Sequence, residues 1–118
     1  MNLINDDIIT YAIQHTEDES KLLKALSKET HQKILQPRMI SGHLQGRFLS
    51  LVSKLIKPQI ILEIGTYSGY ATLCLAEGLT KSGKIHTIEI NEELADFQKK
   101  YFDQSEFKNQ IFTYLGDA

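Results

Sequence analysis

Cysteine is almost absent from this sequence, and long apolar runs are absent altogether. Cys74 is the only cysteine, so no internal disulfide is possible, and a lone thiol is typical of proteins that fold in a reducing compartment. No apolar stretch approaches the ~18 residues that a membrane-spanning helix needs. The first residues also lack the basic region with which a signal peptide starts. We therefore expect a cytoplasmic protein that has no membrane partner.

An excess of positive charge is missing as well. The 13 Lys and Arg residues are scattered along the chain and are outnumbered by 15 Asp and Glu residues, which leaves a formal net charge of −2. Nucleic-acid-binding domains usually carry a basic patch or stripe, so we expect no nucleic-acid partner here. With 118 residues, 42% of them hydrophobic and 24% charged, the composition fits one small globular domain, residues 1–118.

The N-terminal part of the chain has the periodicity of helices. A first helix is predicted over residues 6–15, with Asn5 or Asp6 as its N-cap. The segment Thr16–Glu19 has the form of a capping box, which predicts a second helix over residues 17–34. The apolar face expected for the first helix consists of Ile8, Ile9, Ala12 and Ile13, and that of the second consists of Leu22, Leu23, Leu26 and Ile34.

A third helix is predicted after a break in the pattern. Pro37 ends the second helix, and Ser41 is placed to cap a new helix over residues 42–56. The side chains expected to form its buried face are Leu44, Phe48, Leu51, Val52, Leu55 and Ile56. Residues 1–57 are therefore expected to form a helical N-terminal region.

Residues 58–118 alternate between strand and helix patterns. The predicted order is a strand over 60–64, a helix over 70–80, a strand over 84–90, a helix over 92–103 capped by Asn91, and a strand over 111–115. Connections of this length require parallel strands with right-handed crossovers. The expected fold class is thus α/β: N-terminal helices followed by the first half of a Rossmann-like doubly wound sheet. Such sheets usually have more strands, so we expect a fragment of a longer protein.

The turn after the first strand is the most informative feature of the chain. An apolar run that includes Glu63 stops at Gly65, and a second glycine, Gly69, precedes a helical pattern. Glycines at such a turn let the backbone approach a ligand closely. No Gly-Lys-Ser/Thr follows, and a third glycine is missing, which excludes a P-loop and the dinucleotide fingerprint. Glu63 favours a cationic or neutral ligand, although an ordinary glycine turn stays a possible interpretation.

Two later positions fall at the same edge of the predicted sheet. Glu89 ends the second strand, where a carboxylate can accept both ribose hydroxyls of a nucleoside. The third strand ends at Gly116, Asp117 and Ala118, which can meet an adenine edge. A solvated carboxylate and a common turn are the plain alternatives for each position alone. Their coincidence with the glycine turn favours a nucleoside-like ligand.

Together these motifs resemble a known family. The pattern Glu-x-Gly-x-x-x-Gly after a strand, an acidic residue closing the next strand and Gly-Asp-Ala closing the third resemble class I S-adenosylmethionine-dependent methyltransferases. The segments 36–46 (QPRMISGHLQG), 63–71 (EIGTYSGYA) and 86–91 (HTIEIN) resemble, more narrowly, the catechol and caffeoyl-CoA O-methyltransferases, especially small bacterial members. The resemblance runs from about residue 16 to the C-terminus.

The resemblance implies a set of residues that bind S-adenosylmethionine. These residues are Met39, Ser41, Glu63, Gly65, Thr66, Tyr67, Gly69, Ala71, Glu89, Ile90, Asp117 and Ala118. In the implied site, Met39 and Ser41 lie over the cofactor together with Ile40, and Glu63 lies near the ammonium group. Glu89 holds the ribose, and Ile90 packs on the adenine. Ala71 stands where many relatives have a serine that reaches the cofactor carboxylate.

The resemblance also implies a divalent metal, such as Mg²⁺, and a catechol-like or phenolic hydroxyl as methyl acceptor. The family's metal ligands belong to the second half of its sheet, so we assign no metal ligand and no catalytic residue here. We interpret His15, His31, His43 and His86 as surface or packing residues, and Cys74, which lacks a basic neighbour in the sequence, as a structural thiol. We expect the 118-residue chain alone not to turn over.

Two other functions stay open at this point. A cofactor-binding or interaction module without chemistry fits the chain, whereas an NAD-type oxidoreductase domain fits less well because the third glycine is missing. The first strand is expected to have an open outer edge although its sequence is that of a buried strand. Open apolar edges tend to pair with another chain, so we expect a homodimer or higher oligomer.

Overall fold

The computed structural model describes residues 3–34 and 42–118. Its elements are α1 (Asp6–Gln14), α2 (Lys21–Lys33), α3 (His43–Ile56), β1 (Ile60–Ile64), α4 (Tyr70–Ala76), β2 (Lys84–Glu89), the 3₁₀-helix η2 (Glu92–Leu94), α5 (Ala95–Gln104) and β3 (Ile111–Leu115). The order of helices and strands agrees with the prediction. Asn5 caps α1 by accepting a hydrogen bond from the Asp7 amide at 2.7 Å, and Asn91 caps η2 through the Glu93 amide at 3.0 Å.

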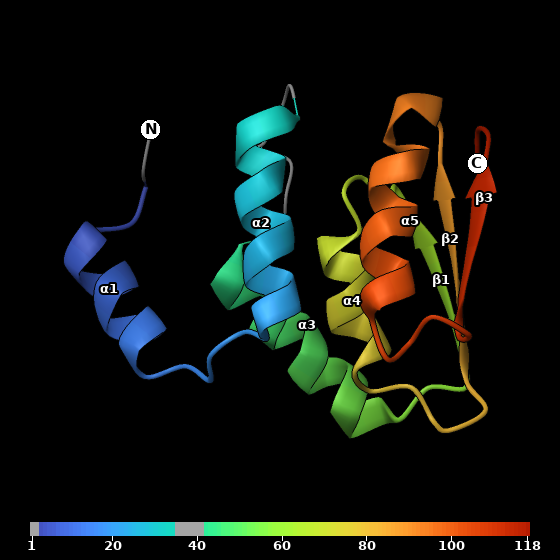
Figure 1. The fold of residues 1–118 in the computed structure, drawn as a ribbon. Helices are drawn as coiled ribbons and strands as arrows, with labels where there is room; N and C mark the ends of the chain where they lie inside the picture. Colours follow the sequence, from blue (N-terminus) through green and yellow to red (C-terminus); the bar gives the residue numbers. More distant parts are fainter. Residues whose placement is uncertain (1–2, 35–41) are drawn as a thin grey trace.

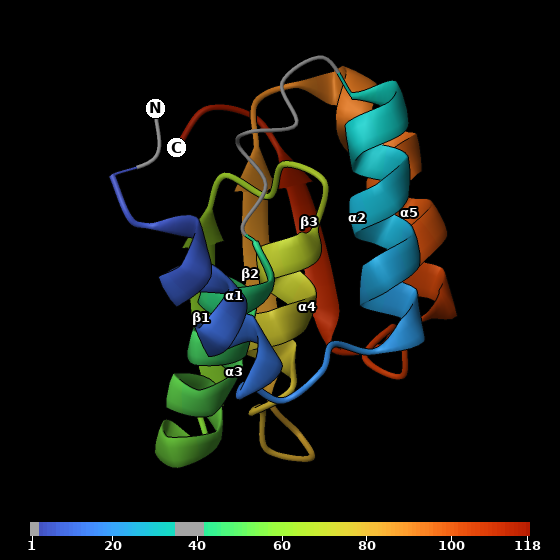
Figure 2. The same ribbon diagram turned by 90° about the vertical axis from the view of Figure 1, so that its left-hand side faces the viewer.

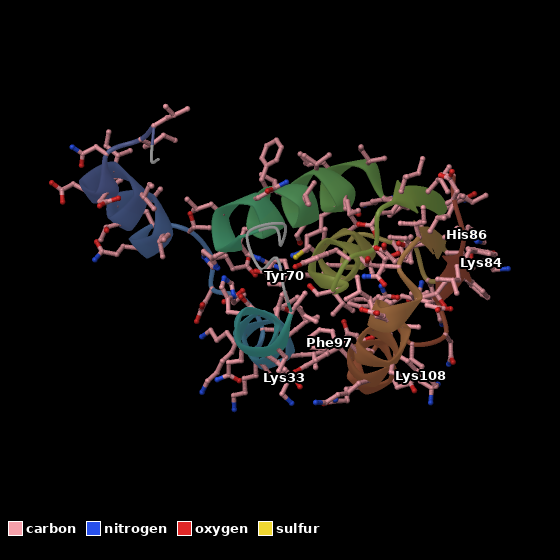
Figure 3. The ribbon with its side chains drawn as sticks, turned by 90° about the horizontal axis from the view of Figure 1, so that it is seen from above. Lys33, Tyr70, Lys84, His86, Phe97 and Lys108 are labelled. Atoms are coloured by element: carbon pink, nitrogen blue, oxygen red, sulfur yellow. The ribbon has the colours of Figure 1, made fainter. Side chains whose placement is uncertain are left out.

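The three strands form one parallel sheet in the order β1-β2-β3. In Figure 1 their arrowheads point the same way, and α4 and α5 lie on the same face of the sheet. On that face Ile85 and Thr87 of β2 are fully buried. Lys84 and His86 alternate with them and point away from the helices (Figure 3), and no described helix covers that side. The half of a doubly wound sheet expected from the sequence is therefore confirmed.

The core lies between the sheet-bound helices and α2. Figure 2 shows α2 alongside α5, on the side of α5 that faces away from the sheet in Figure 1. The buried side chains of this cluster are Leu23, Leu26, Tyr70, Leu73, Cys74, Tyr101 and Phe102. At its edge, Glu29 of α2 accepts hydrogen bonds from Lys100, at 2.8 Å, and from Tyr101. These two donors, with Lys33, lower the pKa of Glu29 to about 2. The carboxylate therefore stays charged and joins α2 to α5.

The predicted capping box at the start of α2 is wrong. The helix begins four residues later than expected, at Lys21, and its N-cap is Ser20, whose hydroxyl accepts from the Leu23 amide at 3.2 Å. The Thr16 hydroxyl instead donates to the Ala12 carbonyl at 2.5 Å, which satisfies the end of α1. A threonine that closes the preceding helix is not available to open the next one. The predicted roles of Pro37 and Ser41 lie outside the described residues.

The predicted buried face of α3 is also wrong. The buried positions of this helix are Gly46, Arg47, Ser50 and Ser53. Its apolar side chains Phe48, Leu51, Leu55 and Ile56 are exposed, between 54% and 75%. The reason is the packing of α3 on α4, which uses small residues for a close approach.

The approach of α3 and α4 leaves no room for larger side chains. A Cβ added to Gly46 would lie 2.7 Å from the Tyr70 ring, and one added to Gly78, just after α4, would lie 2.2 Å from the Ser53 carbonyl carbon. The Ser53 hydroxyl donates to the Leu75 carbonyl at 2.6 Å. Polar and small residues therefore make this contact, and helical periodicity alone predicts the opposite face.

A buried ion pair adds to the same contact. Arg47 donates to both carboxylate oxygens of Glu77, at 2.6 and 3.1 Å, and the Ser50 hydroxyl adds a third hydrogen bond at 3.0 Å. Arg47 also lies 3.7 Å from the sulfur of Cys74. The expectation that Cys74 has no basic neighbour is therefore wrong, because Arg47 comes from α3, 27 positions away in the sequence. Burial still dominates at the thiol and raises the pKa of Cys74 to about 12, which fits a structural role.

We predict that Gly78→Ala destabilises the protein by about 1–3 kcal/mol, because the new methyl group overlaps backbone atoms of α3 that have no room to move. Gly42→Ala is the matched control, since a Cβ at Gly42 has no atom within 4 Å. Urea unfolding of both variants measures the difference. Equal midpoints for the two variants would contradict the close packing of α3 on α4.

Candidate functional site

The turn between β1 and α4 has an unusual backbone. Gly65, Tyr67 and Gly69 all have positive φ, at 93°, 51° and 96°. Two constraints require glycine at position 69. Its φ is positive, and an added Cβ would lie 2.6 Å from the Phe102 ring. Above Gly65, in contrast, an added Cβ has no atom within 4 Å. The turn is thus packed against α5 on one side and leaves open space next to the backbone on the other.

Glu89 joins the end of β2 to this turn. Its Oε1 accepts a hydrogen bond from the Tyr67 amide at 2.7 Å, and its Oε2 accepts from the amides of Ile90 and Asn91, each at 3.0 Å. A carboxylate has about four acceptor positions, so these three bonds leave capacity for a ligand hydroxyl. The predicted acidic residue therefore lies against the predicted glycine turn, as a ribose-binding carboxylate should.

Glu63 is a residue of β1, and its carboxylate lies between α4 and β2, further from the exposed edge of the site than Glu89. Its Oε1 accepts hydrogen bonds from the hydroxyls of Thr72 and, at 2.7 Å, Thr87. Burial raises the pKa of Glu63 above its usual value, and the nearby charge of Glu89 acts in the same direction, while the two hydroxyls oppose the shift. The side chain is half-buried.

The turn also contains an unpaired buried hydroxyl. Ser68 is fully buried, and its Oγ has no hydrogen-bond partner among the described residues. Next to it, the Tyr67 carbonyl accepts from the Gln98 side chain of α5 at 2.6 Å. The Ser68 hydroxyl is therefore not accessible to a ligand, and it is the open space above Gly65 and the spare acceptor capacity of Glu89 that fit a polar, nucleoside-containing cofactor.

The end of β3 completes this edge of the sheet. The Gly116 amide donates to the Glu89 carbonyl at 2.8 Å, so the third predicted segment lies directly beside the second. Gly116 has a φ of 153°, and an added Cβ has no atom within 4 Å. Asp117, Ala118 and Ile90 are exposed at the same edge. Their side chains are accessible to a ligand bound there.

Most of the predicted cofactor residues are thus gathered at one edge, and their roles stay predictions. Glu63, Gly65, Thr66, Tyr67, Gly69, Glu89, Ile90, Asp117 and Ala118 belong to the three segments just described, and Ala71 is half-buried in the first turn of α4. The predicted roles of Met39, Ile40 and Ser41 lie outside the described residues. The sequence analysis missed Ser68, Thr72, Thr87 and Gln98. Only the alternation of β2, which places Thr87 on the same face as Glu89, could have indicated one of them.

Two hollows lie near these elements. A groove of about 390 Å³ runs along α5 and β3 and reaches Glu89, Asn91 and Leu115, so one end of it meets the candidate site. A cavity of about 430 Å³ lies between α2, α4 and the end of α5, and it shares no residue with the glycine turn. We place the candidate site at the turn, because the polar groups converge there.

The part of the chain that the structure describes has no metal-binding cluster. Residues 3–34 and 42–118 contain no cluster of three or more His, Cys, Asp or Glu side chains that could hold an ion. His15 stacks on Tyr11 in α1, and His86 stacks on Phe112 and shares a hydrogen bond of 2.8 Å with the Tyr114 hydroxyl. These contacts agree with the surface or packing role expected for the two histidines. The residues present here do not fit a divalent metal.

The family model described as O-methyltransferase matches residues 13–118. This chain belongs to the O-methyltransferase family. The catechol O-methyltransferase of Niastella koreensis is 35% identical over 74 residues, which are 63% of this chain and 34% of that protein. The catechol O-methyltransferase of Mycobacterium tuberculosis is 28% identical over 101 residues, 86% of this chain and 45% of that protein.

Solved structures agree with this assignment. An O-methyltransferase from Bacillus cereus in complex with SAH is 26% identical, with a TM-score of 0.84, over 94% of this chain and 50% of that one. An SAH-bound methyltransferase from Podospora anserina, 23% identical, matches the fold with a TM-score of 0.88 over 100% of this chain and 53% of that one. The chain therefore spans about half the length, or less, of the relatives it matches.

No helix within the described ranges combines the length and the apolar character that crossing a bilayer requires.

We predict that Glu63→Gln removes a pH-dependent part of the folding stability. Because the pKa of Glu63 is raised in the folded protein, the folded state takes up this proton at a higher pH than the unfolded chain does. The ionised side chain therefore costs stability at neutral pH, and the cost disappears as the pH falls through the folded-state pKa.

Thermal unfolding of the wild type and of Glu63→Gln between pH 4 and 8 measures this effect. We expect the Tm of Glu63→Gln, relative to wild type, to be more favourable at pH 7 than at pH 4. Glu92→Gln, which changes an exposed carboxylate, is the control. A Tm difference for Glu63→Gln that does not vary with pH would contradict the shift.

Proposed function

We propose that this chain forms the cofactor-binding part of an S-adenosylmethionine-dependent O-methyltransferase. The observation that carries the proposal is the arrangement of Glu89, whose carboxylate lies against the left-handed turn with acceptor capacity to spare. Family membership and the SAH-bound relative from Bacillus cereus support the identity of the cofactor. The cofactor supplies a methyl group on a positively charged sulfonium, and the chain's own residues hold and orient it.

The residues of the three strand ends divide this task. Glu89 would accept a ribose hydroxyl at its remaining acceptor position, and the exposed side chain of Ile90 would pack on the adenine. Asp117 and Ala118 would lie at the adenine edge. The hydrogen bond from the Gly116 amide to the Glu89 carbonyl supports this proposal, because it brings the end of β3 beside the end of β2. The methionine part would lie over Gly65 and Thr66, where the backbone is open and where Glu63 contributes negative charge opposite the ammonium group.

The methyl acceptor is proposed from the relatives. Both curated relatives described above are named catechol O-methyltransferases, which favours a catechol-like or phenolic hydroxyl. We derive no step through a metal, because the described residues do not fit one. We also propose that the 118 residues belong to a longer protein and do not turn over alone. Methyl transfer to a catechol by the purified chain with Mg²⁺ would contradict this last point.

We predict that S-adenosylhomocysteine binds to the chain and that Glu89→Ala weakens the binding about 10- to 100-fold. Hydrogen bonds to a charged group contribute about 1.5–3 kcal/mol, and a tenfold change corresponds to about 1.4 kcal/mol. Isothermal titration calorimetry measures both affinities. The matched control is Glu92→Ala, which removes an exposed carboxylate three residues away and should bind like the wild type.

The competing functions give different results in the same experiment. Binding of NADH in preference to S-adenosylhomocysteine would indicate an oxidoreductase domain. Equal affinities of Glu89→Ala and wild type for S-adenosylhomocysteine would remove Glu89 from the site. No binding of either ligand would leave an interaction module as the better interpretation.

We also propose that a second copy of the chain covers the open edge of β1. This strand is at the end of the sheet, and Ile60, Leu62 and Ile64, which lie on the sheet face that no described helix covers, expose between 64% and 73% of their surface. The preceding helix α3 exposes four more large apolar side chains. Apolar patches of several hundred Å² on a soluble protein usually mark an interaction site. Two β1 strands related by a twofold axis would pair antiparallel.

We predict that the chain is a dimer or larger in light scattering after gel filtration and that Leu62→Lys shifts it to the monomer. A lysine on an edge strand opposes pairing because its charge would have to be buried. Thr113→Lys, on the helix-covered face of the edge strand at the other side of the sheet, is the control and should leave the oligomer intact. A monomeric wild type at the highest soluble concentration would contradict the proposal.

A further inference from the structure

A chain of hydroxyl groups lies beneath the candidate cofactor site. Glu63 of β1 and Thr87 of β2 are register partners in the sheet. Thr72 reaches the same carboxylate from α4, and Thr66 reaches Thr87 from the glycine turn. The three threonines expose at most 2% of their surface. The network therefore joins four segments, and none of its hydroxyls is in contact with bulk water.

The direction of the hydrogen bonds follows from the number of protons. The Thr87 hydroxyl lies 2.7 Å from Glu63 Oε1 and 2.5 Å from the Thr66 hydroxyl. A hydroxyl has one proton, and an ionised carboxylate only accepts. Thr87 thus donates to Glu63, and Thr66 must donate to Thr87. The position of the Thr66 side chain is fixed by a bond that exists only while Thr87 is oriented by Glu63.

The main chain holds this part of the turn less firmly. The amides of Gly65 and Thr66 both point at the Ile88 carbonyl, at 2.8 Å and 3.3 Å, so Thr66 has the longer bond. One residue further on, the Tyr67 amide is held by Glu89 at 2.7 Å. Thr87 and Glu89 are two residues apart and lie on the same face of β2. The turn is consequently hydrogen-bonded to β2 at two places. Thr66 binds Thr87 below the turn, and the Tyr67 amide binds Glu89 at the exposed edge of the site.

We propose that Thr87 and Thr72 are positioning residues of the cofactor site. Through Glu63 and Thr66 they hold the turn in the conformation that a ligand over Gly65 requires, so that binding does not have to order it. This inference rests on the proposed function. Neither threonine is placed to touch the cofactor, because both side chains are buried beneath the turn.

Packing alone does not explain the network. Valine has the shape of threonine, so a site that needed only to be filled would accept it without loss. Replacing Thr87 by valine would remove the donor to Glu63 and the acceptor for Thr66 together. The half-buried carboxylate of Glu63 and the buried hydroxyl of Thr66 would each lose a partner, which costs more than the hydrogen bond contributes when it is formed.

The test compares Thr87→Val with Thr87→Ser and Thr30→Val. Thr30 is a fully buried threonine of α2 whose hydroxyl donates to the Leu26 carbonyl, so Thr30→Val makes the same chemical change away from the turn. Calorimetric titration with S-adenosylhomocysteine should show a loss of affinity of about tenfold for Thr87→Val. Thr87→Ser should recover most of it, and Thr30→Val should bind like the wild type even if its Tm falls.

A second measurement needs no ligand. Hydrogen exchange followed by NMR should show faster exchange of the Gly65 and Thr66 amides in Thr87→Val than in the wild type, with Thr30→Val unchanged at these positions. Thr72→Val should act in the same direction, because it removes the other donor to Glu63.

The outcomes separate this inference from the proposed function. If the wild type binds no S-adenosylhomocysteine, the proposed function fails, whatever the exchange data show. If the wild type binds and Thr87→Val binds equally well, the positioning role is wrong and the proposed function stands. Equal affinity losses in Thr87→Val and Thr30→Val would show a general loss of stability and would also overturn the positioning role.

Discussion

The fastening of the β1–α4 turn to β2 is the constraint on which the candidate site depends. Three residues of this turn have left-handed backbone conformations, and one of them, Tyr67, is not glycine. Such a conformation is costly unless the surroundings hold it. The Glu89 carboxylate supplies that hold at the Tyr67 amide, and Phe102 of α5 closes against Gly69. The open space above Gly65 therefore results from contacts made on the other side of the turn.

The order of the elements and the location of the site could be predicted from local chemistry. Strand ends in a parallel sheet meet at one edge, so Glu63, Glu89 and Gly116 had to come together once the strands were recognised. The threonine network beneath them could not be predicted in the same way. Threonine is a common strand residue, and the pairing of Thr87 with Glu63 depends on the register of β1 and β2, which no local pattern specifies.

Helix α3 shows a different reason for failure. Its apolar spacing is that of a buried face, yet the helix packs on α4 through its small and polar side instead. The face that α3 packs on α4 is determined by Gly46 and Gly78, which allow a close approach, and by Glu77, which pairs with the buried Arg47. Gly78 and Glu77 are distant from α3 in the sequence, so the pattern of α3 alone could not indicate their contribution. The family relationship determined the fold class but not the face that α3 uses.

The α3–α4 contact also has a consequence for the order in which the chain folds. It joins residues that are only 22 to 30 positions apart, such as Ser53 with Leu75 and Arg47 with Glu77. The contact between α2 and α5, through Glu29 and Tyr101, spans 72 positions. Closing a shorter loop loses less chain entropy, so the α3–α4 contact forms at a lower entropic cost than the α2–α5 contact. The β1–β2 pairs, such as Ile60 with Lys84, are 24 positions apart and belong to the same short-range group. Helix α2 therefore joins a unit whose α3–α4 and strand contacts are all more local than its own.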